Sequence, residues 1–113
     1  MLNDSSGQFK SRSKTEMNSK SGNEKILRIY REILEHAFSD SDYWYLIGND
    51  IILDELLNFD DLAWSEIQDD LSNWDSNQLK IFTDALLSDY SNSHTEILDK
   101  RLKLNNYIER SLK

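Results

Sequence analysis

The chain has 113 residues, a formal net charge of −8, three glycines, and neither cysteine nor proline. This length suggests one domain, and the lack of cysteine excludes disulfides and thiolate metal sites. Scarce turn residues argue against a β-sandwich, and no apolar run reaches the roughly 18 residues of a membrane span. The N-terminus lacks the apolar core of a signal peptide, so we expect an all-α protein in the cytoplasm, away from membranes.

Residues 1–22 are mostly Ser, Lys, Asn, Gly, Thr and Arg, and their few apolar residues follow no period. Such a segment offers too little apolar surface to offset the entropy lost on ordering. We therefore predict a disordered, polar and basic tail over residues 1–22, followed by an acidic helical domain over residues 23–113.

Apolar residues at three- and four-residue steps predict a first helix over residues 24–38, with Asn23 as its N-cap. Ser39 and Asp40 supply the break and the next cap. Residues 41–59 also read as helical, but Gly48 lies in their middle. We favour two helices with Gly48 at the end of the first; one longer helix with a glycine inside is the alternative.

Two further helices are each preceded by aspartates. Asp60 or Asp61 caps a helix whose apolar stripe is Trp64, Ile67, Leu71 and Trp74. Asp75 and Ser76 precede a helix whose stripe is Leu79, Phe82, Leu86 and Tyr90, and which ends at residues 91–93. A last helix runs from Ser93 or His94 to the C-terminus. The predicted fold is a compact antiparallel bundle of four to five helices with a disordered N-terminal tail.

The charge is distributed unevenly along this bundle. Residues 38–99 hold fifteen acidic side chains and one cation, Lys80, whereas residues 1–37 and 100–113 are net positive. Helix capping explains several of the carboxylates but not the near absence of lysine. Because charge distribution governs association, the asymmetry indicates a basic protein partner. The same field repels phosphate, so we expect no direct binding of nucleic acid.

Catalytic and metal-binding signatures are missing from the sequence. His36 and His94 are isolated, without a His-x-x-x-His or Glu-x-x-His pair. An EF-hand loop beginning at Asp40 would require glycine where Tyr45 stands. There is also no glycine-rich loop for phosphate. We therefore expect no enzymatic activity, no metal and no cofactor.

The run from Asp40 to Tyr45 contains three adjacent aromatic residues, and neighbours on a helix differ by about 100° in direction. At least one of them is therefore expected to be partly exposed beside carboxylates, as in many protein interfaces. The alternative is that Trp44 belongs to the core and both tyrosines line its rim. The acidic residues from Asp50 to Asp70 are expected to face outward. The candidate partner-binding residues are Asp40, Asp42, Tyr43, Tyr45, Asp50, Asp54, Glu55, Asp61, Glu66, Asp69 and Asp70.

Residues 60–87 combine an Asp-Leu-x-Trp start at Asp61, the stripe that ends at Trp74, and the run Asn-Gln-Leu-Lys-Ile-Phe from Asn77. A small, acidic, cysteine-free helical bundle of this type resembles the helical immunity proteins of bacterial toxin systems, such as colicin-nuclease, polymorphic and contact-dependent toxins. The resemblance implies a non-catalytic inhibitor that covers the cationic site of a toxin domain. Two alternatives stay open: a DNA mimic that antagonises a nucleic-acid-binding enzyme, and a helical accessory or scaffold domain.

Overall fold

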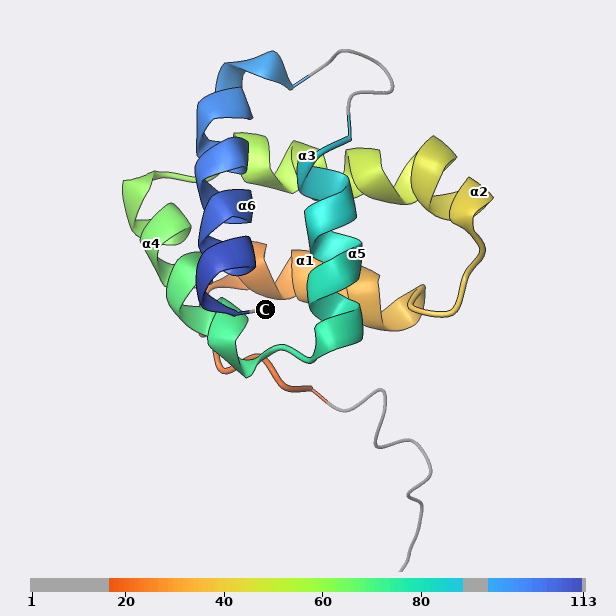
Figure 1. Cartoon of the computed structure of the whole chain (residues 1–113), viewed down its shortest axis with the longest axis horizontal. Coiled ribbons are helices and arrows are strands. Elements are labelled where there is room, and N and C mark those ends of the chain that lie inside the picture. Colours follow the sequence, from red (N-terminus) through yellow and green to blue (C-terminus); the bar gives the residue numbers. More distant parts are fainter. Residues whose placement is uncertain (1–16, 89–93, 113) are drawn as a thin grey trace, which may run out of the picture.

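The computed structural model describes residues 17–88 and 94–112, and all regular structure within them is helical (Figure 1). The helices are α1 (Glu24–Glu35), α2 (Ser41–Tyr43), a π-helical turn (Trp44–Gly48), α3 (Asn49–Leu57), α4 (Asp61–Asp70), α5 (Ser76–Leu86) and α6 (Leu98–Ser111). Short 3₁₀ turns occupy Leu71–Asn73 and Thr95–Ile97. The predicted all-α bundle is thus confirmed, and none of the helices described has the length and apolar character needed to span a membrane.

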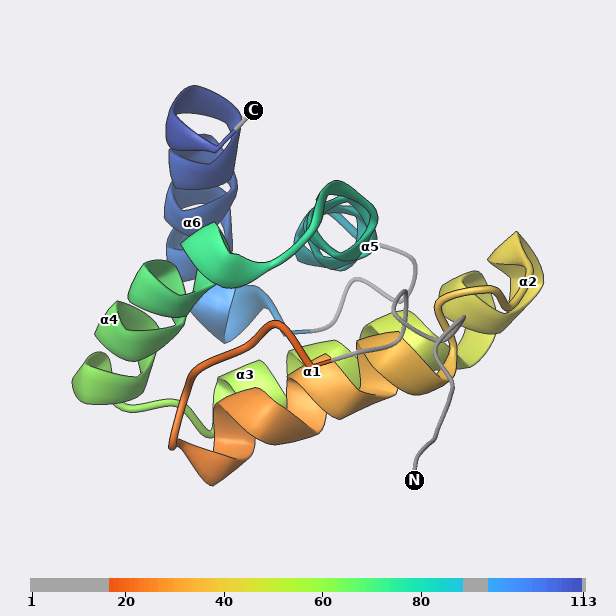
Figure 2. The ribbon, with the colours of Figure 1, turned by 90° about the horizontal axis from the view of Figure 1, so that it is seen from below.

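The helices form two layers. Helices α1 and α3 lie side by side and antiparallel, and α5 packs across both of them (Figures 1 and 2). Helix α6 contacts α5 and runs back in the opposite sense, while α4 contacts α1 at one end of the molecule. In both views α2 lies at the end opposite α4, so the α2 and α4 regions present separate surfaces.

Four of the helix starts follow the predicted caps. A cap side chain accepts a hydrogen bond from an N–H that the first helical turn leaves unpaired. The capping residues are Asn23, Asp40, Asp60 and Asp75. At Asp75 the bond is reciprocal, because the Gln78 side chain accepts from the Asp75 backbone N–H at 3.0 Å. The first helix is shorter than predicted and ends at Glu35.

The core lies between the two layers and is built from the predicted apolar stripes. Trp74 is central, with its ring centroid 5.0 Å from that of Tyr30 and 5.3 Å from that of Phe82, both in edge-on geometry. Its stripe is not one helix, however, because α4 ends at Asp70 and Trp74 follows a 3₁₀ turn in extended conformation. Trp64, at the other end of the stripe, is only half-buried beside Phe59.

The favoured division of residues 41–59 into two helices is wrong. Gly48 has helical dihedral angles (φ −63°, ψ −40°), and the helix continues through it by way of the π turn. Glycine is needed at this position because of packing and not because the helix ends there. A Cβ at this position would lie 2.3 Å from Cε3 of Trp44, because the indole ring lies directly over the Gly48 backbone.

Residues 17–22, which we call the strap, are not helical but lie against the bundle. The backbone N–H of Asn18 donates to the Tyr30 hydroxyl at 2.7 Å, and Ser19 and Lys20 both donate to the Asp70 carboxylate. Asp70 is consequently only 5% exposed, so the expectation that it faces outward is wrong. Residues 1–16 of the predicted tail lie outside the described residues. The helix predicted to end at residues 91–93 is shorter, because α5 ends at Leu86.

Candidate partner-binding surface

Large apolar side chains are exposed where α1 ends and the π turn begins. Phe38, Tyr45, Leu46 and Ile47 are 73%, 54%, 56% and 50% exposed. The π turn explains the last three: Trp44 packs over Gly48, one turn apart, and the residues between them point away from the core. Such turns are rare in helices and are frequent at functional sites.

Carboxylates flank these apolar residues. Asp42 is exposed, Asp50 is half-exposed, and Asp40 caps α2 through the backbone N–H of Tyr43. Within residues 17–88 and 94–112, these three carboxylates form no ion pair. We define the α2 surface as Phe38, Asp40, Asp42, Tyr45, Leu46, Ile47 and Asp50. Apolar side chains beside carboxylates without counter-ions are typical of a surface that binds a basic protein.

Tyr43 and Trp44 hold the α2 surface in place rather than forming part of it. The Tyr43 ring stacks on His36 with a centroid distance of 4.1 Å and an interplanar angle of 17°, and its hydroxyl donates to Glu32. The Trp44 indole N–H donates to the backbone oxygen of His36 at 3.1 Å. Tyr45 is therefore the exposed member of the aromatic run, which confirms the expectation that the three cannot all turn inward.

Burial, the hydrogen bond to Glu32, and the negative charges of Glu32 and Glu35 together raise the pKa of Tyr43 to about 12. Tyr43 therefore remains a neutral hydrogen-bond donor throughout the physiological range. These contacts give Tyr43 a positioning role next to the α2 surface.

In the part of the chain that the structure describes, Glu32, Glu35 and His36 form a group whose potential ligand atoms lie within 4.8 Å of one another. Two carboxylates and an imidazole are chemically able to hold a divalent transition metal. Both half-buried members already have partners, since Tyr43 donates to Glu32 and His36 Nδ1 lies 3.4 Å from the Ser39 hydroxyl. Glu32 and His36 therefore already have a structural role, because they support the Tyr43 ring.

Three other candidate carboxylates are engaged with neighbouring elements. Asp54 lies 2.7 Å from His94 Nε2, Glu55 lies 3.5 Å from Arg28 Nη1, and Asp61 lies 3.3 Å from Lys100 Nζ. The pairs of Glu55 and Asp61 are solvent-exposed and contribute little to stability. They do reduce the charge that these carboxylates offer to a partner.

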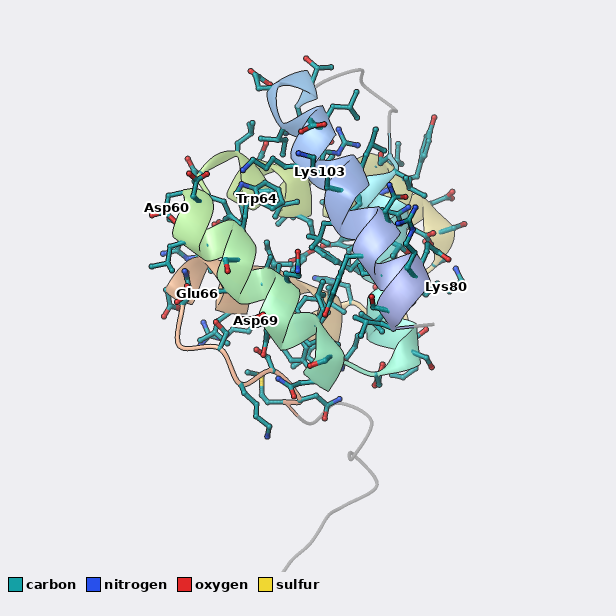
Figure 3. The ribbon with its side chains drawn as sticks, turned by 60° about the vertical axis from the view of Figure 1, so that its left-hand side comes forward. Asp60, Trp64, Glu66, Asp69, Lys80 and Lys103 are labelled. Carbon is teal, nitrogen blue, oxygen red and sulfur yellow. The ribbon has the colours of Figure 1, made fainter. Side chains whose placement is uncertain are left out.

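The remaining candidates follow α4, at the end of the molecule opposite α2 (Figure 3). Glu66 accepts a hydrogen bond from the Asn23 side chain at 2.8 Å, Asp69 is exposed, and Asp70 is buried under the strap. The eleven predicted residues therefore do not form one surface. Asp40, Asp42, Tyr43, Tyr45 and Asp50 lie at the α2 end, and Tyr43 supports the α2 surface rather than forming part of it.

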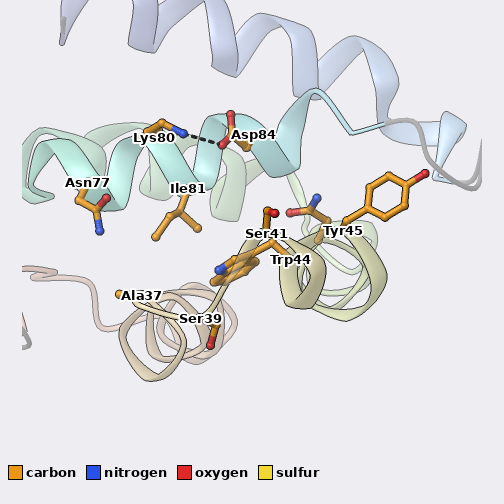
Figure 4. Close-up of a pocket in the computed structure, with 10 residues that line it drawn as sticks. Ala37, Ser39, Ser41, Trp44, Tyr45, Asn77, Lys80, Ile81 and Asp84 are labelled. Atoms are coloured by element: carbon orange, nitrogen blue, oxygen red, sulfur yellow. Dashed lines mark hydrogen bonds and ion pairs between the residues drawn. The ribbon is translucent and has the colours of Figure 1, made fainter.

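The sequence did not indicate a pocket of about 380 Å³ that lies beside Tyr45, between α5, the π turn and the residues that follow α1 (Figure 4). Its lining residues are Ala37, Ser39, Ser41, Trp44, Tyr45, Asn49, Asn77, Lys80, Ile81 and Asp84. One feature of the sequence could have pointed to this pocket. Its lining residue Lys80 is the single cation between residues 38 and 99.

The α2 surface and the adjoining pocket together offer exposed aromatic and apolar groups, carboxylates and a concave site. This combination is suited to holding another protein. Comparisons of the chain with protein-family models, with curated proteins and with solved structures found no match.

Proposed function

We propose that the protein is a non-catalytic cytoplasmic inhibitor of the bacterial immunity type, which binds and neutralises a basic toxin domain through the α2 surface. One observation carries the proposal. Tyr45, Leu46 and Ile47 are exposed beside Asp42 and Asp50, within a segment of fifteen acidic side chains and one cation. Exposed apolar groups with this charge asymmetry are complementary to a cationic protein surface.

The physical mechanism divides between charge and apolar burial. The negative field steers a cationic domain toward the α2 surface and raises the association rate at low salt. Burial of Tyr45, Leu46 and Ile47 then slows dissociation. A toxin that acts on nucleic acid has a cationic substrate site, and a bundle seated over or beside that site blocks access of the substrate.

The product of the reading frame adjacent to this gene is the first partner to test. Purified full-length protein should bind it, with an association rate that falls as salt is added. Co-expression should restore growth to cells that produce the toxin domain. Tyr45→Ala should speed dissociation by roughly tenfold, as expected for loss of an interface aromatic.

Charge variants separate the α2 surface from the overall charge. Asp42→Asn with Asp50→Asn should slow association about threefold, because it removes two carboxylates at the interface. Asp69→Asn with Asp75→Asn removes the same charge from exposed positions outside the α2 surface and should change the rate less. Failure to bind the neighbouring product, together with failure to protect cells, would reject the proposal. Competition with DNA for a DNA-binding enzyme would instead indicate a DNA mimic.

A further inference from the structure

The pocket beside Tyr45 is bounded by three elements (Figure 4). Lys80, Ile81 and Asp84 extend from α5, Ala37 and Ser39 lie at the end of α1, and Trp44 lies between them. Tyr45 belongs both to the pocket and to the α2 surface, so the two adjoin.

The walls of the pocket are of two kinds. Trp44 and Ile81 supply apolar and aromatic contact, whereas Asp84 supplies an exposed carboxylate. Asn49 also lines the pocket and is only 9% exposed, and its Oδ1, which is itself buried, has no hydrogen-bond partner among the described residues. An apolar wall beside several acceptors matches a side chain that has flat faces and many donors.

We propose that this pocket receives an arginine side chain of the basic partner. The inference rests on the proposed function and names the anchor that the partner would supply. A guanidinium presents five N–H donors in one plane and stacks on aromatic rings, whereas the ammonium of lysine is a compact, strongly hydrated point charge. The guanidinium would lie against Trp44 and donate to Asp84, with rotation of the Asn49 amide bringing its free oxygen to a further donor.

Lys80 is the competing cation at this site. Its Nζ lies 3.2 Å from Oδ2 of Asp84, and the two side chains are 69% and 61% exposed. An exposed pair of this kind is weak, so the arriving guanidinium can displace the ammonium into solvent. The two rim residues therefore have opposite effects, since Asp84 favours the guanidinium and Lys80 opposes it.

The probe is N-acetyl-L-arginine amide, titrated into the full-length ¹⁵N-labelled protein and followed by NMR. The Trp44 indole N–H and the amides of residues 77–84 should shift in a saturable way. N-acetyl-L-lysine amide should produce smaller shifts. Asp84→Asn should weaken arginine binding about threefold through loss of an exposed ion pair, and Lys80→Gln should strengthen it about threefold.

Asp69→Asn is the matched control, because it removes one exposed carboxylate from α4. Its affinity for the arginine probe should equal that of the wild type. Equal shifts from the lysine and arginine probes, or equal binding by Asp84→Asn and wild type, would overturn the inference. The proposed function would survive if the neighbouring toxin domain still bound with unchanged affinity to Asp84→Asn. Conversely, saturable arginine binding without any toxin binding would reject the proposed function and retain the arginine specificity of the pocket.

Discussion

The carboxylate of Asp70 accepts a hydrogen bond of 2.8 Å from the backbone N–H of Lys20, fifty positions earlier in the chain. It also accepts from the Ser19 hydroxyl at 2.5 Å, the Trp74 indole at 2.9 Å and the Asn73 side chain at 3.1 Å. One buried side chain thus joins the strap to the end of α4 and to the aromatic core. The strap belongs to the folded domain for this reason, although it is not helical.

Asp70→Asn should lower the free energy of unfolding by about 2–4 kcal/mol, because one amide oxygen cannot accept from all four donors and hydrogen bonds to a charged group are strong. Urea unfolding at neutral pH, followed by tryptophan fluorescence, measures the loss. Asp69→Asn is the control, since Asp69 is exposed, and it should stay within about 0.5 kcal/mol of wild type. Equal stability of the two variants would contradict the role assigned to Asp70.

The stability should fall in acid in a way that depends on Asp70. Burial acts to raise the pKa of this carboxyl, but the hydrogen bonds from Ser19, Trp74, Lys20 and Asn73 outweigh it and lower the pKa below its usual value. The ionised form is therefore favoured by folding. Its contribution is complete above the ordinary aspartate pKa of about 4, and it is lost as the pH falls through the lower pKa of the folded state.

Urea unfolding at constant ionic strength, at a series of pH values from neutral to acid, tests this dependence. Wild type should lose more unfolding free energy than Asp70→Asn over the acid part of the series, because the variant has no carboxyl to protonate at this position. Parallel losses in both proteins would show that other carboxylates govern the acid transition.

Trp74→Ala should cost about 3–5 kcal/mol of unfolding free energy, as expected for truncation of a large core side chain. Trp74 is 5% exposed and contacts Tyr30 and Phe82. Trp64→Ala should cost roughly half as much, because Trp64 is half-buried at the edge of the core. Thermal or urea unfolding of both variants gives the comparison, and a larger loss for Trp64 would mean that the packing of α4 is misassigned.

Gly48→Ala should destabilise the protein by about 1–3 kcal/mol, although alanine is the better helix former by about 1 kcal/mol. The new Cβ would lie 2.3 Å from Cε3 of Trp44 and 2.9 Å from Cε2 of Tyr43. Neither ring moves freely, because Trp44 donates to the His36 backbone and Tyr43 stacks on the His36 ring. Urea unfolding measures the change.

Gly22→Ala is the matched control for Gly48→Ala. A Cβ at Gly22 meets nothing within 4 Å, and its φ is not positive. Its unfolding free energy should be unchanged or slightly higher, because alanine restricts the unfolded chain. A stabilising effect of Gly48→Ala would show that the ring of Trp44 does not lie over the glycine.

Added salt should raise the melting temperature by a few degrees between about 0.02 M and 0.2 M NaCl, because it screens repulsion among the carboxylates of residues 38–99. These residues hold fifteen acidic side chains and one lysine. Differential scanning calorimetry of the full chain measures the shift. A melting temperature that falls over this range would mean that the exposed ion pairs stabilise the fold more than the repulsion destabilises it.

The sequence by itself determined the features that depend on near neighbours. Asn23, Asp40, Asp60 and Asp75 cap helices because each side chain reaches an N–H two or three residues ahead. The apolar stripes, and with them the all-α fold, follow from the 3.6-residue period in the same way. The exposure of Tyr45 could also be predicted, since three adjacent aromatics diverge around a helix.

Only the tertiary structure decided how distant residues meet. Asp70 has the same local pattern as the exposed Asp69, and its burial depends on the strap fifty positions earlier. Gly48 resembles a helix end until the Trp44 ring is placed over it. The separation of the α2 region from α4, at opposite ends of the molecule, likewise depends on how the helices pack. Local hydrogen bonds and periodicity carry no information about such contacts, because they arise only when helices far apart in the chain come together.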